Sequence, residues 1–162
     1  MDADLDFVDL KILEILQEDG RASHSAIAEA VGLSQPSVHE RVKKLEARGV
    51  IKGYAAIVEP EALGLDVLAF VSVRLNDYKP DDIASAIADI PEIVETHHIA
   101  GDECFIVKVR CRTNKDLQSI LQRIWEAGPV VGSKTTVAFA TSKETTALPL
   151  PKAEPQKERR SA

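Results

Sequence analysis

The chain of 162 residues is poor in cysteine and in aromatic residues, with two Cys and 4% Phe, Trp and Tyr together. Cys104 and Cys111 are separated by an odd number of positions in a strand-like run. Their side chains would therefore point to opposite faces and cannot pair locally. No disulfide framework and no cysteine-based zinc site is expected. This usage fits a reducing cytoplasm, which is the location we expect.

Long apolar runs are also missing. The longest lies around residues 67–73, far below the roughly 18–20 residues that span a bilayer. The first six residues are acidic and lack the basic region that a secretory signal needs. We therefore expect no membrane association.

Positive charge is scarce overall, since 20 Lys and Arg stand against 26 Asp and Glu, a net charge of −6. Such a balance counts against a nucleic-acid-binding protein, which is more often basic. The charges are unevenly spread, however: residues 1–20 carry seven acids and one base, whereas residues 41–48 carry four bases. The local field decides whether a phosphate backbone is attracted, so a basic patch in an acidic protein can still bind DNA.

The first fifty residues predict three helices. Apolar residues recur at three- and four-residue spacing from Leu5 to Leu16, which is typical of an amphipathic helix. Ser23 can cap a short second helix, and Gly32 permits a sharp turn after it. Ser34 can cap a third helix that carries Pro36 in its first turn, where the missing N–H has no cost.

Helix, short helix, glycine-containing turn and helix form the helix-turn-helix arrangement, whose last helix reads the major groove. Gln35 suits a bidentate contact to adenine, Arg41 a guanine or a phosphate, and the later lysines suit phosphates. The candidate DNA-binding residues are Ser34, Gln35, Ser37, His39, Arg41, Lys43 and Lys44. The alternative is a three-helix bundle whose third helix has a solvated basic face. The turn, the cap and the basic run together favour DNA binding.

Residues 50–58 are interpreted as a short element, a glycine and then a strand, which would make the domain winged-helix-like. Pro60 and Gly64 mark a linker. The sequence thus predicts a DNA-binding domain over residues 1–58 and a linker over residues 59–66.

The next segment predicts a second domain over residues 67–141. Apolar runs predict strands over residues 67–75, 93–99, 103–112 and 131–141. Two helices are expected: one begins at Pro80, and the other is capped by Asn114. The order βαββαβ favours a ferredoxin-like sandwich. Its helices would cover one face of the sheet and leave the other free to pair with a second copy.

Residues 142–162 contain three prolines, few apolar residues and a basic end. We interpret this segment as a largely disordered tail. Its basic end could be an auxiliary DNA-binding tail, but a solubilising linker is the favoured interpretation.

The chemistry of catalysis and metal binding has little support in the sequence. His97 and His98 are adjacent, so on a strand they would face opposite ways and could not chelate one metal. His24 and His39 have no cysteine or clustered carboxylates at metal-ligand spacing. No glycine-rich phosphate loop or nucleophile elbow is found. We expect no enzyme, no metal and no cofactor.

Several motifs in one order resemble the Lrp/AsnC family of feast/famine regulators. They are Leu5-Asp6-x-x-Asp9 with Ile12-Leu13, Val31-Gly32-Leu33-Ser34, Arg41-Val42-Lys43-Lys44-Leu45-Glu46, Gly49-Val50-Ile51-x-Gly53-Tyr54, Ala69-Phe70-Val71 and the Gly101 loop. The resemblance covers roughly residues 5–140. It implies a DNA-binding domain, a ligand-sensing domain of the RAM type, and dimers that commonly assemble into octamers. It also implies an amino acid or related metabolite as effector, bound between dimers.

The effector loop of that family usually reads Thr-Gly-x-x-Asp. Here Ala100 stands in place of Thr and Cys104 in place of Asp, so charge for an α-amino group must come from Asp102 or Glu103, or the ligand differs. Hydroxyls on the last strand are further candidates, contributed by a neighbouring subunit. The candidate effector-binding residues are Gly101, Asp102, Glu103, Cys104, Ser133, Thr135 and Thr136.

The sequence therefore predicts an α+β protein with an N-terminal helix-turn-helix domain and a C-terminal ferredoxin-like βαββαβ sandwich. We expect a sequence-specific transcription regulator that binds a pseudo-palindromic operator in double-stranded DNA and responds to an amino acid. The alternative is a metabolite-binding or catalytic ferredoxin-like oligomer whose N-terminal helices serve assembly only. Such helices would have no reason to concentrate bases on an outward face.

Overall fold

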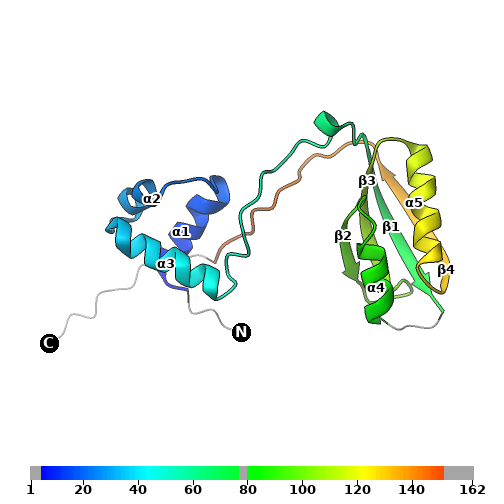
Figure 1. The fold of residues 1–162 in the computed structure, drawn as a ribbon, viewed down its shortest axis with the longest axis horizontal. Helices are drawn as coiled ribbons and strands as arrows, with labels where there is room; N and C mark the ends of the chain where they lie inside the picture. The colour runs from blue at the N-terminus through cyan, green and yellow to red at the C-terminus, as the bar shows by residue number, and fades with distance from the viewer. Residues whose placement is uncertain (1–4, 77–79, 152–162) are drawn as a thin grey trace. The chain divides into compact units, whose positions relative to one another are not determined.

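The computed structural model describes residues 5–76 and 80–151. The chain divides into two compact units, Met1–Ala56 with Glu144–Ala162, and Ile57–Lys143. The first unit is helical and the second combines a sheet with helices (Figure 1). The predicted α+β class is confirmed. None of the helices in the described residues has the length and apolar character that crossing a membrane requires.

Three helices build the first unit: α1 (Phe7–Glu18), α2 (His24–Val31) and α3 (Gln35–Ala47). Each begins at a polar cap, because Asp6, Ser23 and Ser34 accept a backbone N–H from the first turn. Gly32 then takes the left-handed conformation, with φ 69°, at the end of α2. Since glycine adopts that conformation without a Cβ clash, the sharp turn into α3 follows from this residue.

The core of the first unit comes from one face of each helix. Ile12, Ile27 and Val38 are fully buried at its centre. The full set of buried residues is Ile12, Leu13, Ile27, Ala28, Val38, Val42 and Leu45. These are the positions that the helical spacing of apolar residues predicts.

The strand predicted near residues 54–58 is not formed. Residues 52–59 have no regular structure and are exposed, and η1 (Glu61–Leu63) is a short 3-10 helix within the predicted linker. A strand needs a partner for its backbone groups, and the described chain supplies none beside this segment. The winged-helix element of the prediction is therefore wrong for this chain taken by itself.

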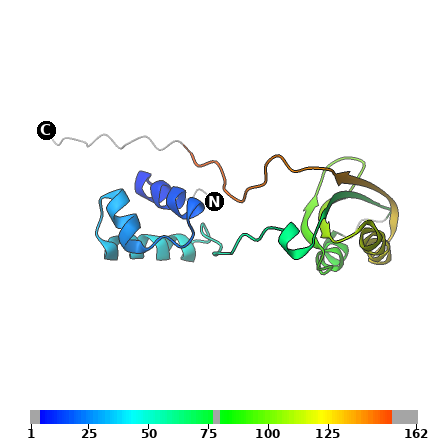
Figure 2. The same cartoon turned by 90° about the horizontal axis from the view of Figure 1, so that it is seen from above.

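The second unit contains four strands and two helices in the predicted βαββαβ order. They are β1 (Val67–Leu75), α4 (Pro80–Ala88), β2 (Ile93–His98), β3 (Phe105–Cys111), α5 (Asn114–Glu126) and β4 (Val130–Ala138). The strands are antiparallel and follow the order β2-β3-β1-β4. Both helices cover the same face of this sheet (Figures 1 and 2). This is the predicted ferredoxin-like sandwich.

Alternation along the strands separates the two faces of the sheet. Val71 and Val73 of β1 and Val107 of β3 are fully buried in the core beneath the helices. Phe70 and Lys108, which pair across β1 and β3, lie on the opposite face. One capping prediction is wrong: Thr113, not Asn114, caps α5, because its hydroxyl accepts from the N–H of Asp116 in a capping box.

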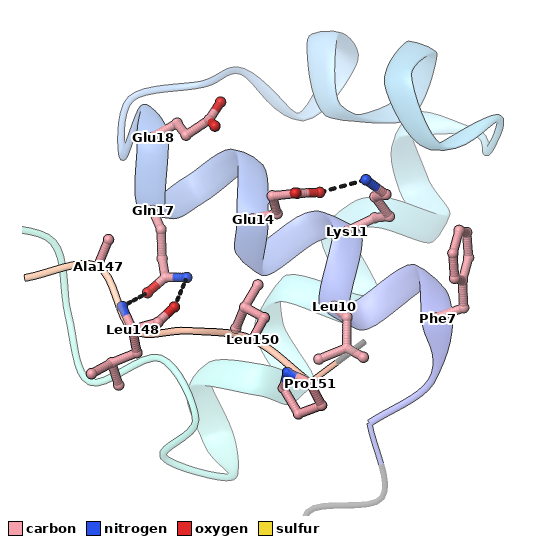
Figure 3. A pocket seen from close by; sticks show the side chains of 10 residues that line it. All are labelled: Phe7, Leu10, Lys11, Glu14, Gln17, Glu18, Ala147, Leu148, Leu150 and Pro151. Atoms are coloured by element: carbon pink, nitrogen blue, oxygen red, sulfur yellow. Dashed lines mark hydrogen bonds and ion pairs between the residues drawn. The ribbon is translucent and has the colours of Figure 1, made fainter. Parts of the chain in front are cut away.

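The end of the described chain differs from the predicted disordered tail. The side-chain amide of Gln17 on α1 both donates to the Leu148 carbonyl at 3.2 Å and accepts from the Leu148 N–H at 2.6 Å. Leu150 packs against the core of the first unit. Figure 3 shows this segment lying along α1, where it lines a groove with Phe7 and Leu10. The basic end of the tail lies outside the described residues.

Candidate nucleic-acid interface and effector loop

The start of α3 is fixed by two serines. The Ser34 hydroxyl accepts from the Ser37 N–H at 3.3 Å, and the two hydroxyl oxygens lie 2.8 Å apart. Both were predicted as DNA-binding residues. In the structure they order the first turn of α3, and this places the following side chains in register.

Three of the predicted residues lie one turn apart along the exposed side of α3. Gln35, His39 and Lys43 follow each other at four-residue spacing, and all three are exposed. We call them the polar stripe. Lys44 is also exposed, and neither lysine has an ion-pair partner within the described residues. The structure thus brings the amide, the imidazole and Lys43 together on one side of α3. Lys44 lies on another side, where it lines a pocket with Ser37, Arg41 and Asp9.

Arg41 has a different environment from the one expected. Its Nη1 lies 2.7 Å from Asp6 Oδ2 and 2.7 Å from Asp9 Oδ1, and only 32% of its side chain is exposed. These hydrogen bonds, the one to Asp6 foremost, raise the pKa of Arg41. The guanidinium therefore ties α3 to the start of α1 instead of standing free for guanine or phosphate. Spacing along α3 alone could not reveal this, because both partners lie on another helix.

The acid in that contact is also perturbed. Burial raises the pKa of the Asp6 carboxyl, but the hydrogen bond from the Asp9 N–H and the contact with Arg41 lower it by more. The net pKa lies below its ordinary value, so Asp6 stays ionised under all but acidic conditions.

A pair of histidines on the DNA-binding unit was not predicted. The rings of His24, at the start of α2, and His39, in the polar stripe, have centroids 5.2 Å apart and planes tilted by 58°. The sequence placed them fifteen positions apart and gave no sign of contact. The turn at Gly32 brings them together.

The predicted effector loop joins β2 to β3. Gly101 and Asp102 are exposed, while Glu103 and Cys104 are half-buried. The Cys104 N–H donates to the Val73 carbonyl at 2.8 Å, so the loop is anchored beside β1. This anchor places the residues of the loop, Asp102 and Glu103 included, at one end of the sheet.

The predicted hydroxyls on β4 do not share one face. Ser133 and Thr135 pair with Val73 and Val71 and lie on the helix-covered side, whereas Thr136 pairs with Phe70 on the opposite side. Ser133 and the Cys104 loop both lie beside Val73, two strands apart. The structure thus brings Ser133 toward the loop and separates Thr136 from it.

Trp125 contacts one of the predicted effector residues, and the sequence did not indicate this contact. It is 47% exposed on α5, and its indole N–H donates to the Ser133 hydroxyl at 3.2 Å. A large aromatic ring that stays half exposed is a sign of a contact surface. Its position in the predicted amphipathic helix gave no such signal, because apolar residues of that helix are expected in the core.

The uncovered face of the sheet carries a charged cluster. The Lys108 ammonium donates to Glu95 at 2.9 Å, and His97 lies 3.3 Å from the same carboxylate. The hydrogen bond from Lys108 lowers the pKa of Glu95. Phe70 remains 37% exposed on this face. This face is therefore mixed, with one half-exposed aromatic ring beside paired charges.

Comparison with known proteins agrees with this division of the chain. Residues 5–46 match the AsnC-type helix-turn-helix domain, and residues 68–148 match the Lrp/AsnC ligand binding domain. The chain is 42% identical over 146 residues to the HTH-type transcriptional regulator FL11 of Pyrococcus horikoshii. That alignment covers 90% of this chain and 97% of the relative.

Two solved structures of similar fold contain an amino acid. A feast or famine regulatory protein from Mycobacterium tuberculosis complexed with L-methionine is 34% identical, with a TM-score of 0.82 over 87% of this chain and 96% of that one. A transcriptional regulator from Neisseria meningitidis in complex with L-Met is 29% identical, with a TM-score of 0.83 over 90% of this chain and 96% of that one. With both domains matched in order and relatives aligned over nearly their whole length, the chain belongs to the Lrp/AsnC family of helix-turn-helix transcription regulators.

Proposed function

We propose that this protein binds operator DNA through the polar stripe of α3 and Lys44, and that an amino acid bound by its second unit controls that binding. The observation that carries the DNA part is the arrangement on α3. Gln35 stands at the start of the helix, where base edges are read. Lys43 and Lys44, which have no ion-pair partner among the described residues, stand two turns later. Arg41 joins α3 to the start of α1 through its contacts with Asp6 and Asp9.

We further propose that two copies pair through the uncovered face of the sheet. The exposed ring of Phe70 and the cluster of Glu95, His97 and Lys108 give that face a mixed apolar and polar surface. A two-fold dimer would present two α3 helices to successive major-groove segments, about one helical turn apart. Assembly of four such dimers into an octamer is the further step that the family resemblance implies.

The amino-acid effector is supported by two observations. The two structural neighbours named above contain L-methionine. In this chain the loop with Asp102 and Glu103 supplies carboxylates for an α-amino group, and Trp125 with Ser133 supplies an apolar and hydroxyl surface nearby on the same unit. Ligand binding between dimers would then couple to DNA binding with about 1–3 kcal/mol.

A regulator of this kind acts without catalysis or a cofactor of its own, and we place it in the cytoplasm. The alternative is a catalytic or metabolite-binding oligomer in which α1 to α3 serve assembly. The exposed lysines of α3, without an ion-pair partner in the part of the chain that the structure describes, support regulation over that alternative.

Titration of labelled duplex DNA with the protein at several salt concentrations tests this proposal. The variant Lys43→Ala/Lys44→Ala should weaken binding to every duplex and reduce the slope of log affinity against log salt by about 2. The matched control Lys115→Ala/Lys143→Ala removes the same charge from exposed positions of the second unit. It should change neither quantity.

Unchanged affinity and salt slope in the α3 variant would overturn the assignment of this surface. A wild-type protein that ignores duplex DNA at low salt while it turns over a small molecule would favour the catalytic alternative.

A further inference from the structure

The two imidazoles of His24 and His39 are the strongest unexplained feature of the structure. They come from different helices, and neither ring nitrogen has a hydrogen-bond partner among the described residues. His24 is half-buried and His39 is exposed. Two imidazoles with access to solvent, whose nitrogens have no partner among the described residues, are available ligands for a metal ion.

Their separation agrees with coordination of one ion. Zinc binds imidazole nitrogen at about 2.0–2.1 Å, which puts the ring centre about 3.2 Å from the ion and two rings on a tetrahedral ion about 5.2 Å apart. The observed centroid separation is 5.2 Å, and the planes are tilted by 58° instead of stacked.

We propose that His24 and His39 form a binding site for a divalent transition-metal ion such as Zn²⁺ on the DNA-binding unit. Imidazole suits Zn²⁺, Ni²⁺ and Cu²⁺, whereas Mg²⁺ and Ca²⁺ prefer oxygen ligands. The described residues hold no group of three or more His, Cys, Asp or Glu around one point. The remaining coordination positions are therefore filled by water, or by duplex DNA when it is bound.

The positions of His24 and His39 in their helices explain how the two rings are held. Ser23 caps α2 and thereby fixes the position of His24 at the first residue of that helix. Ser34 caps α3, and His39 follows one turn after Gln35. The two capped helices, joined by the Gly32 turn, hold the two rings without a third protein ligand among the described residues.

Calorimetric titration of the full chain with ZnCl₂, in the absence of DNA, tests the site. We expect one ion per chain, with an affinity that falls about tenfold or more in His24→Gln and in His39→Gln, because one imidazole remains in each. The matched control is His97→Gln, which removes an exposed imidazole from the second unit. It should leave the stoichiometry and affinity unchanged, and MgCl₂ should give no binding at this site.

The imidazole signals in an NMR spectrum recorded with substoichiometric Cu²⁺ supply an independent readout. Paramagnetic broadening should appear first on His24 and His39, and should weaken at acidic pH as protons compete for the ring nitrogens. Zinc binding that survives in the double variant His24→Gln/His39→Gln, broadening that begins on His97 or His98, or no uptake of zinc would each overturn the proposal. The titration contains no DNA, so its outcome is independent of the proposed regulation.

Discussion

Arg41 Nη1 lies 2.7 Å from Asp9 Oδ1, and this contact joins the third helix of the DNA-binding unit to the first. Asp9 is the one polar residue among the buried side chains of the described chain, with 8% of its surface exposed. Its backbone N–H also closes the capping box with Asp6. One base of the run on α3 is thus held in a contact within the unit, and the proposed DNA contacts come from its neighbours.

Replacing Arg41 with Ala should lower the free energy of unfolding by about 1–2 kcal/mol. Loss of the guanidinium leaves a largely buried carboxylate without its charged donor. Urea denaturation followed by circular dichroism measures the change. The control Lys43→Ala removes an exposed base from the same helix and should stay within about 0.5 kcal/mol of wild type. Equal stability of the two variants would show that the Arg41 contact contributes nothing.

Acidic pH should weaken the contact between Asp6 and Arg41. The pKa of Asp6 is lowered in the folded state from an ordinary value of 3.8, so its contribution to stability is complete above that value and is lost as pH falls through the lowered pKa. Melting temperatures from pH 6 down to pH 2.5 should therefore fall more steeply for wild type than for Asp6→Asn, which keeps a good helix cap but no titrating group. Parallel curves would contradict this assignment.

The docked end of the chain should contribute to the stability of the helical unit. Leu150 packs on its core, so Leu150→Ala should lower the free energy of unfolding by about 1 kcal/mol. The control is Leu148→Ala, because that side chain is 73% exposed and only its backbone contacts Gln17. Thermal unfolding compares the two. If Leu150→Ala is no less stable than the control, this segment does not belong to the unit in solution.

Effector binding should depend on the acids of the loop between β2 and β3. A thermal-shift screen against the amino acids should raise the melting temperature with at least one of them, because a ligand of the folded state stabilises it. Asp102→Asn/Glu103→Gln should reduce that shift, while the control Glu126→Gln on the exposed side of α5 should retain it. No shift with any amino acid would count against the effector proposal and leave the DNA-binding proposal standing.

Most of the fold could be predicted from local sequence patterns. Caps such as Ser23 and Ser34, the left-handed Gly32 and the alternation in β1 and β3 are signals within a few residues, and the structure follows them. The strand expected after Gly53 is not formed, because strand formation depends on more than local sequence. A strand depends on a partner elsewhere, and an extended run alone does not show whether one exists.

The site was less accessible to sequence reasoning, because its decisive contacts join distant positions. In the sequence, Arg41 is a base of the same run as Lys43 and Lys44. Only the fold shows that two carboxylates, those of Asp6 and Asp9, lie beside it. The contact between His24 and His39 and the hydrogen bond from Trp125 to Ser133 likewise depend on tertiary packing. Residue types at fixed spacing therefore predicted the surface of α3 but not which of its side chains are free.

The central claim, that the polar stripe of α3 reads base sequence, is tested most directly by the preference of the protein for one duplex over another. A duplex selected from a random pool and a scrambled version of it would be titrated at the same salt concentration with wild type and Gln35→Ala. We predict that wild type prefers the selected duplex by about a thousandfold or more. We also predict that Gln35→Ala loses about 1–3 kcal/mol of that preference at the adenine it contacts. Equal binding of both duplexes by wild type, or an unchanged preference in the variant, would contradict this account.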